Sequence, residues 1–115
     1  LECYNQSIRI KPSAFWCIKK GWFLFMIDDY EEALASFDEA IRLEPKGATA
    51  WKRKATVLRI MKKYPQALEC ADEAIRLEPE YAGAWNEKGD ILKAMNRIDD
   101  ADQCFAKAKE LEENE

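Results

Sequence analysis

The sequence predicts an all-α protein built from a repeated pair of helices, and two observations carry this prediction. First, the octapeptide Asp-Glu-Ala-Ile-Arg-Leu-Glu-Pro occurs at Asp38–Pro45 and again at Asp72–Pro79, displaced by 34 residues. A period of this length is typical of arrays in which each unit buries its apolar face against its neighbours. Second, apolar residues within the unit recur at helical spacing, without the strict alternation of a strand.

The same period extends over almost the whole chain. Equivalent residues are Ala33, Ala67 and Ala101; Ala40, Ala74 and Ala108; Trp51 and Trp85; Gly21, Ala55 and Gly89; and Tyr30, Tyr64 and Ile98. The first helix of a unit is expected from residues such as Trp51, Ala55 and Leu58, which share one helical face.

A break between the two helices of each unit is predicted at Asp28-Asp29, Lys62-Lys63 and Asn96-Arg97. Asp and Asn tolerate the left-handed conformation that ends a helix, and Lys does so less readily. The second helix then begins, with Asp29 and Glu32 as a capping pair and Pro65 in a first turn. Pro12, Pro45 and Pro79 are expected to stop the second helices.

These residues resemble the tetratricopeptide repeat (TPR): a tryptophan, a small residue four positions later, two alanines and a terminal proline at the same period. The resemblance implies a right-handed superhelix of antiparallel helix pairs, an α-solenoid of about three and a half units. We expect units at residues 13–46, 47–80 and 81–115, preceded by the second helix of a truncated repeat at 1–12. Leu1 would then lie inside a repeat, as in a fragment of a longer protein. Departures from the family pattern are Cys17 in the tryptophan slot, Ala71 in an aromatic slot, and Lys20, Lys54 and Lys88 in a leucine slot.

Composition argues against most catalytic chemistry. The chain has no histidine, the commonest general base and metal ligand, and no glycine-rich phosphate loop. Cys3, Cys17, Cys70 and Cys104 show no close pairing, so we interpret them as packing residues in a reducing, cytoplasmic setting. The acidic pairs Asp28-Asp29 and Asp99-Asp100 are interpreted as helix caps rather than metal ligands. We therefore expect neither an enzyme, nor a cofactor, nor a metal site.

Charge and hydropathy also limit the partners. The net charge of −4 and the scattered basic residues disfavour nucleic acid, although Lys52, Arg53 and Arg59 form a local basic cluster. The longest apolar run, Trp22–Ile27, is too short to cross a membrane. A protein or peptide ligand remains as the expected partner.

In the resembling family, the first helices of successive units line a concave groove that binds peptides. The expected groove residues grade from apolar through basic to mixed polar: Phe15, Ile18, Trp22 and Phe25; Lys52, Arg53, Thr56 and Arg59; Asn86 and Asp90. Some family members clamp a chaperone's C-terminal carboxylate in this groove. Here Thr56 and Glu87 occupy positions where asparagines are needed, so that subclass is disfavoured.

The expected function is a protein-interaction scaffold with an apolar anchor at Trp22 and Phe25. Cys17, Gly21, Leu24 and Ile27 are expected to complete the core of the first hairpin, which leaves Phe15, Ile18, Trp22 and Phe25 as a second apolar stripe. A preceding repeat or a second copy of the chain would bury this stripe instead if it is not a ligand site. The alternative function is accordingly a structural segment of a longer array that self-associates through its apolar N-terminal end. An accessory domain of an enzyme is a third possibility.

Overall fold

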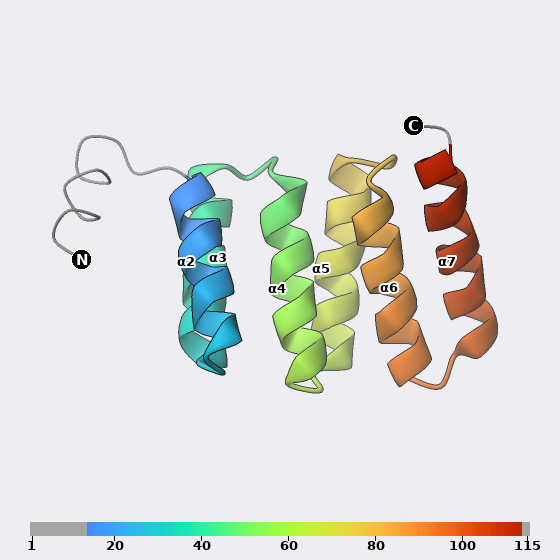
Figure 1. Ribbon diagram of the computed structural model, residues 1–115, viewed down its shortest axis with the longest axis horizontal. Helices are drawn as coiled ribbons and strands as arrows, with labels where there is room; N and C mark the ends of the chain where they lie inside the picture. The colour runs from blue at the N-terminus through green and yellow to red at the C-terminus, as the bar shows by residue number, and fades with distance from the viewer. Residues whose placement is uncertain (1–13, 114–115) are drawn as a thin grey trace, which may run out of the picture.

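The structure, a computed structural model, describes residues 14–113, and within this range it contains six α-helices and no strand (Figure 1). The helices are α2 (Ala14–Met26), α3 (Tyr30–Leu43), α4 (Ala48–Ile60), α5 (Tyr64–Leu77), α6 (Ala82–Ala94) and α7 (Ile98–Glu113). The expected all-α solenoid is confirmed. The helix predicted for residues 1–12, with Cys3 and Pro12, lies outside the described residues.

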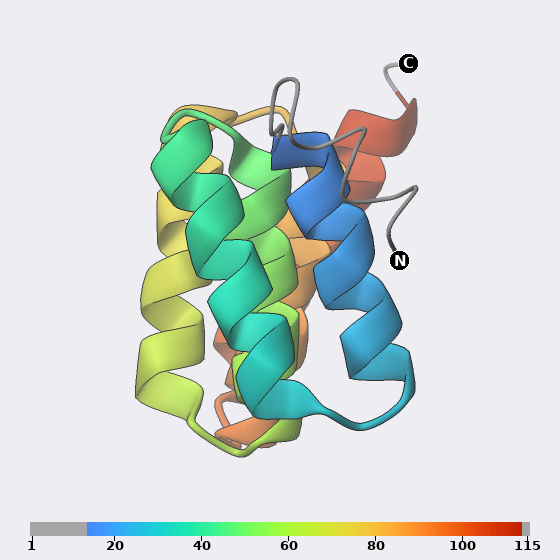
Figure 2. The same cartoon turned by 90° about the vertical axis from the view of Figure 1, so that its left-hand side faces the viewer.

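The helices pack as three antiparallel hairpins in a row, α2/α3, α4/α5 and α6/α7 (Figure 1). Consecutive hairpins are joined by contacts of α3 with α4 and of α5 with α6. The first helices also touch one another, α2 with α4 and α4 with α6. Figure 2 looks along the row and separates the two layers, with α3 and α5 on one side and α2 on the other.

The predicted break within each hairpin is confirmed. Asp28, Lys62 and Asn96 adopt positive φ angles of 65°, 65° and 66°. The residue that follows each of them donates its N–H to a carbonyl five residues back, as in Asp29 to Leu24 at 2.8 Å. This is the six-residue closure of a Schellman helix end. Lys62 carries the conformation at a cost that aspartate and asparagine largely avoid.

The capping prediction for the second helices is wrong in one respect. Asp29 occupies the N-cap position of α3, but its side chain makes no capping hydrogen bond. Its neighbour Asp28 accepts a hydrogen bond from the Tyr30 hydroxyl at 3.0 Å, and Asp100 pairs with Arg97 instead. The three hairpin turns share one backbone closure, so the turn positions the start of the second helix without a side-chain cap. Pro65 does lie in the first turn of α5, as expected.

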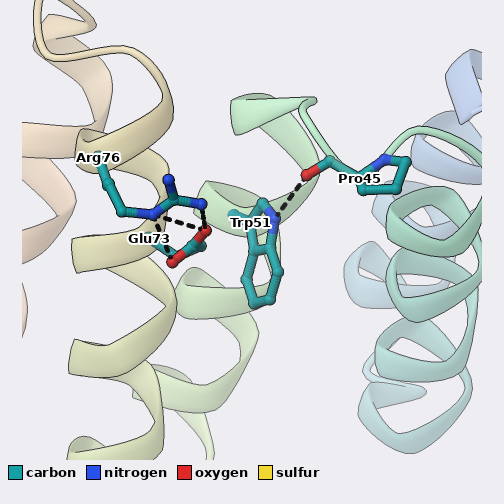
Figure 3. A network of polar contacts seen from close by, with 4 residues as sticks. All are labelled: Pro45, Trp51, Glu73 and Arg76. Atoms are coloured by element: carbon teal, nitrogen blue, oxygen red, sulfur yellow. Dashed lines mark hydrogen bonds and ion pairs between the residues drawn. The ribbon is translucent and has the colours of Figure 1, made fainter.

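The turn between hairpins is fixed by the tryptophan of the repeat. The indole N–H of Trp51 donates to the Pro45 carbonyl at 3.4 Å, and that of Trp85 donates to Pro79 at 2.9 Å. Figure 3 shows Trp51 reaching this carbonyl. A proline ends each preceding second helix, and the indole satisfies the carbonyl left free there. The spacing of proline and tryptophan in the sequence therefore has a direct structural cause.

Small residues allow close helix packing inside each hairpin. A Cβ on Gly21 would lie 2.7 Å from the Phe37 ring, and one on Gly89 would lie 2.5 Å from the Phe105 ring. In the middle hairpin the same slots hold Ala55 and Ala71, both fully buried. A glycine thus faces a phenylalanine, and an alanine faces an alanine.

Lys54 and Lys88 occupy the position that the family usually gives to leucine, and each packs its stem between helices while its ammonium group pairs with a carboxylate. Their ammonium groups reach Asp38 at 2.6 Å and Asp72 at 2.8 Å on the preceding hairpin, while their side chains remain mostly buried. Lys20 is exposed.

Cys70 and Cys104 are buried free thiols, and burial raises the pKa of Cys70 to about 11. These two cysteines act as packing residues.

Candidate functional site

The helices α2, α4 and α6 form one continuous layer, and we call their outer side the first-helix face. The structure places all ten predicted groove residues on these helices: Phe15, Ile18, Trp22 and Phe25 on α2; Lys52, Arg53, Thr56 and Arg59 on α4; Asn86 and Asp90 on α6. They do not form a single site. They divide into an aromatic cluster between α2 and α4 and a charged cluster between α4 and α6.

The aromatic cluster is centred on Trp22. The rings of Trp22 and Phe25 stack with centroids 5.0 Å apart, and Phe25 contacts Tyr30 at 5.6 Å. Trp22, Phe25 and Ile18 are half-buried because they pack against a core cluster that includes Val57 of α4. The following hairpin therefore already covers part of the second apolar stripe of α2. Phe15 is different, since it remains 60% exposed.

Arg53 completes the aromatic cluster from α4. Its guanidinium lies over the Trp22 ring, 4.2 Å from the centroid, in a cation–π arrangement. Beside this pair, a cleft of about 610 Å³ opens between α2, α4 and the two turns that precede α4 and α6. Its lining consists of Phe15, Ile18, Lys19, Trp22, Glu44, Lys46, Gly47, Ala48, Thr49, Arg53 and Glu78.

The charged cluster is organised around Glu87 of α6, which is only 5% exposed. The Thr56 hydroxyl donates to Glu87 Oε1 at 2.6 Å, and Arg59 Nε donates to Glu87 Oε2 at 2.7 Å. Two donors thus compensate the buried carboxylate. From the sequence, Glu87 is predicted only to oppose the binding of a chaperone tail. The sequence carries no direct signal for this pairing, because the period relates Glu87 to Arg53 and not to Thr56 or Arg59.

Lys52, Asn86 and Asp90 surround this centre. Burial lowers the pKa of Lys52, and the neighbouring Arg53 lowers it further. Burial raises the pKa of the Asp90 carboxyl, against the opposing effect of Arg59. Asn86 is half-buried on α6. The middle of the first-helix face is therefore polar, with its strongest charges already paired.

A second apolar surface was not anticipated from the sequence. Phe23, Met26 and Ile27 are 64%, 66% and 55% exposed, and they lie along one edge of α2 and its C-terminal end. The prediction that Ile27 belongs to the core of the first hairpin is wrong. Helix α2 ends at Met26, and Ile27 projects from the turn. Gly21 and Leu24 are buried as expected, whereas Cys17 is only half-buried.

Residues 14–113 contain neither a candidate metal site nor a candidate membrane-spanning helix. No group of three or more His, Cys, Asp or Glu side chains in this range could hold a metal ion. None of the described helices is both long and apolar enough to span a membrane.

The repeat geometry agrees with family models. Models described as tetratricopeptide repeat match residues 17–46, 48–81 and 82–115. The chain belongs to the tetratricopeptide repeat family. This family is a non-enzymatic kind of scaffold, and its repeats support a protein-interaction scaffold in this chain. A search of curated proteins finds no significant match.

Several solved structures share the TPR fold of this chain. MamA aligns with a TM-score of 0.84 and 26% sequence identity, over 98% of this chain and 67% of that protein. The second TPR of Spaghetti (RPAP3), bound to the HSP90 peptide SRMEEVD, aligns with a TM-score of 0.81 and 22% identity, over 92% and 98% of the two chains. The first TPR of the same protein, bound to the same peptide, aligns with a TM-score of 0.83 and 22% identity, over 90% and 82%.

Proposed function

We propose that this TPR protein binds a peptide or protein segment along the first-helix face, with Trp22 and Phe25 as its apolar anchor. The observation that carries the proposal is the cleft between α2 and α4, where Trp22 and Ile18 form an apolar wall beside Arg53. Half-buried aromatic side chains in a cleft are the usual centres of binding energy in interfaces. The two Spaghetti (RPAP3) domains hold a peptide on the same fold, so the architecture accommodates this class of ligand.

The chaperone tail itself is not part of the proposal. In the register that starts at α4, Glu87 would place a buried carboxylate near the end of the ligand. In the register that starts one repeat earlier, Ile18 and Trp22, which pack against the core, would fall in the polar clamp positions. Glu87 also engages Arg59, so this arginine is not free to bind a second carboxylate. The ligand we propose is a segment with an apolar residue for the Trp22 cleft.

We also propose a cytoplasmic location, which the free thiols of Cys17, Cys70 and Cys104 support.

The test is peptide selection followed by mutation of the anchor. A phage-displayed library of random dodecapeptides should yield binders, and Trp22→Ala should weaken the best of them by about 2 kcal/mol or more. The loss is expected because alanine removes both the aromatic wall and the platform under Arg53. Affinity is measured by fluorescence anisotropy, with circular dichroism to verify helicity.

Phe23→Ala is the matched control for this experiment. It removes an aromatic side chain from the same helix, but Phe23 does not line the cleft. Undiminished binding by a well-folded Trp22→Ala protein would contradict the anchor.

Self-association is a second candidate function, favoured by the exposed edge of α2. Phe23 is 64% exposed, whereas the equivalent residues one and two periods later, Val57 and Ile91, are fully buried against a preceding hairpin. The edge thus has the composition of a hairpin-docking surface. A second copy of the chain is the occupant that this candidate requires.

A further inference from the structure

Arg53 differs from the other arginines of residues 14–113 in having no carboxylate partner. Arg42 pairs with Glu39, Arg59 with Glu87, Arg76 with Glu73 and Arg97 with Asp100. The Nε atom of Arg53 is buried and makes no hydrogen bond. A buried donor without an acceptor costs free energy, so an acceptor that reaches this guanidinium would be favoured.

The repeat supplies an internal comparison for this slot. Moving back one period of 34 residues takes Glu87 to Arg53, Thr56 to Trp22 and Arg59 to Phe25. Between α4 and α6, Glu87 is satisfied by Thr56 and Arg59. Between α2 and α4, Arg53 lies over the Trp22 face, which offers no lone pair. The position is therefore occupied by a paired carboxylate between α4 and α6, and, between α2 and α4, by an arginine that has no carboxylate partner within residues 14–113.

The surroundings of Arg53 favour an anionic group with an apolar neighbour. The cleft beside it is lined by three cations, Lys19, Lys46 and Arg53, and by two carboxylates, Glu44 and Glu78, a balance of +1. In the described part of the chain, neither glutamate forms an ion pair with these cations, and both are exposed on the turns. The apolar residues Phe15, Ile18 and Trp22 line the same cleft, and Trp22 lies directly against the arginine.

We infer that Arg53, stacked on Trp22, binds the side-chain carboxylate of an aspartate or glutamate in the bound peptide, with an adjacent apolar residue in the cleft. This inference rests on the proposed function and specifies its ligand. Arginine suits the role because its planar guanidinium can stack on an indole while its N–H groups remain directed at a carboxylate. Lys19 and Lys46 add attraction from the rim.

The inference is tested with a phage-displayed library of random dodecapeptides whose carboxyl ends are joined to the coat protein. This library offers only side-chain carboxylates, so a chain terminus cannot imitate them. Wild-type protein should enrich sequences with Asp or Glu next to an aromatic or aliphatic residue. The best sequence is then synthesised as two peptides, one acidic and one with the corresponding amide.

A mutant cycle assigns the carboxylate to its partner. In the wild type the amide peptide should bind about tenfold more weakly than the acidic one, as expected for one charge-assisted hydrogen bond. In Arg53→Gln that difference should largely disappear, whereas Arg53→Lys should retain part of it. The control is Arg76→Gln, which removes an arginine of the same charge from α5 and should leave the affinity difference between the two peptides unchanged. If Arg53→Gln does not fold, Lys46→Glu on the exposed turn should reduce the same difference.

The outcomes separate the two claims. Enrichment of acidic residues in the wild type, together with loss of the acid–amide difference in Arg53→Gln, supports the inference. Peptides that bind without acidic preference, or an acid–amide difference that survives Arg53→Gln, overturn the inference and leave the proposed function standing. A library that yields no binder overturns the proposed function and the inference with it.

Discussion

At the scale of single residues, side-chain size is matched across each hairpin of the repeat. Gly21 faces Phe37, Gly89 faces Phe105, and Ala55 faces Ala71. The sequence shows the two slots varying, but periodicity alone does not say that they touch. The structure supplies the reason, because a Cβ and a phenyl ring cannot occupy the same space.

Gly89→Ala should destabilise the protein despite the better helix propensity of alanine. The propensity gain is about 1 kcal/mol, whereas overpacking against Phe105 costs typically about 1–3 kcal/mol, so a net loss is expected. Phe105→Ala alone should cost less than the roughly 3–5 kcal/mol typical of a fully buried phenylalanine, because Phe105 is only partly buried. The double variant recreates the alanine pair of the middle hairpin, so its loss should be smaller than the sum of the two single losses. Urea denaturation followed by circular dichroism measures all three; simple additivity would refute the size matching.

Structural features that depend on a single residue type could be predicted from the sequence. The left-handed positions at Asp28 and Asn96 and the prolines after α3 and α5 follow from backbone chemistry, and the structure confirms them. The Glu87 pairing and the free Arg53 were not predicted. Both depend on which side chains of adjacent hairpins meet, and the period gives this only when the hairpins are placed side by side.

At the scale of helices, cross-hairpin lysines replace part of the apolar packing. Lys54 and Lys88 link α4 to α3 and α6 to α5 through Asp38 and Asp72. Their stems are mostly buried while the paired aspartates are half-exposed, so most of the contribution is expected from the stems. The capping prediction for Asp29 failed at this same scale, because a closed turn from the preceding helix already fixes where α3 begins.

Replacing Lys20, Lys54 and Lys88 together by methionine should leave the fold intact or more stable. Methionine keeps the stem volume, and the aspartates left without partners remain in contact with water. We expect the free energy of unfolding to fall by no more than about 1 kcal/mol, the upper range for such pairs. Glu87→Met is the contrasting control, since it leaves the half-buried Arg59 without its acceptor and should cost about 1–3 kcal/mol, while the Thr56 hydroxyl keeps its hydrogen bond to the Lys52 carbonyl at 3.2 Å. Loss of helicity in the triple variant, seen by circular dichroism, would show that the charges are structurally required.

At the scale of the whole molecule, the two ends of the row differ in polarity. The edge of α2 exposes Phe23 and Met26. The outer side of α7 has Asp102 and Lys109, both exposed, where earlier units have leucine and isoleucine. The outer side of α7 is therefore polar, whereas the exposed apolar edge of α2 is the surface through which we propose self-association.

Sedimentation velocity over a range of concentrations should reveal association through α2. Phe23→Glu should abolish it, because the charge would have to be buried in the interface. Ile98→Glu, at an exposed position on α7, should not change it. A wild-type protein that remains strictly monomeric at high concentration would contradict self-association.

The sequence predicted the helices, their order and the protein-interaction class, because a repeat fixes local structure and stacking together. It placed all the candidate residues on the first-helix face. It did not predict their division into an aromatic cluster and a paired charged cluster. That division follows from Val57 and Arg53 packing against α2, and from Glu87 entering the space beside Thr56.

Nuclear magnetic resonance of the protein during titration with a selected peptide tests the central claim most directly, that ligands bind at the Trp22 cleft of the first-helix face. The Nε–H signals of Trp22 and Arg53 report on this cleft, and the indole N–H of Trp85, bonded to Pro79, is an internal reference. Binding in the cleft should shift the first two signals and leave the third unchanged. Saturable binding that shifts residues of α3, α5 or α7 while Trp22 and Arg53 stay unperturbed would contradict the claim.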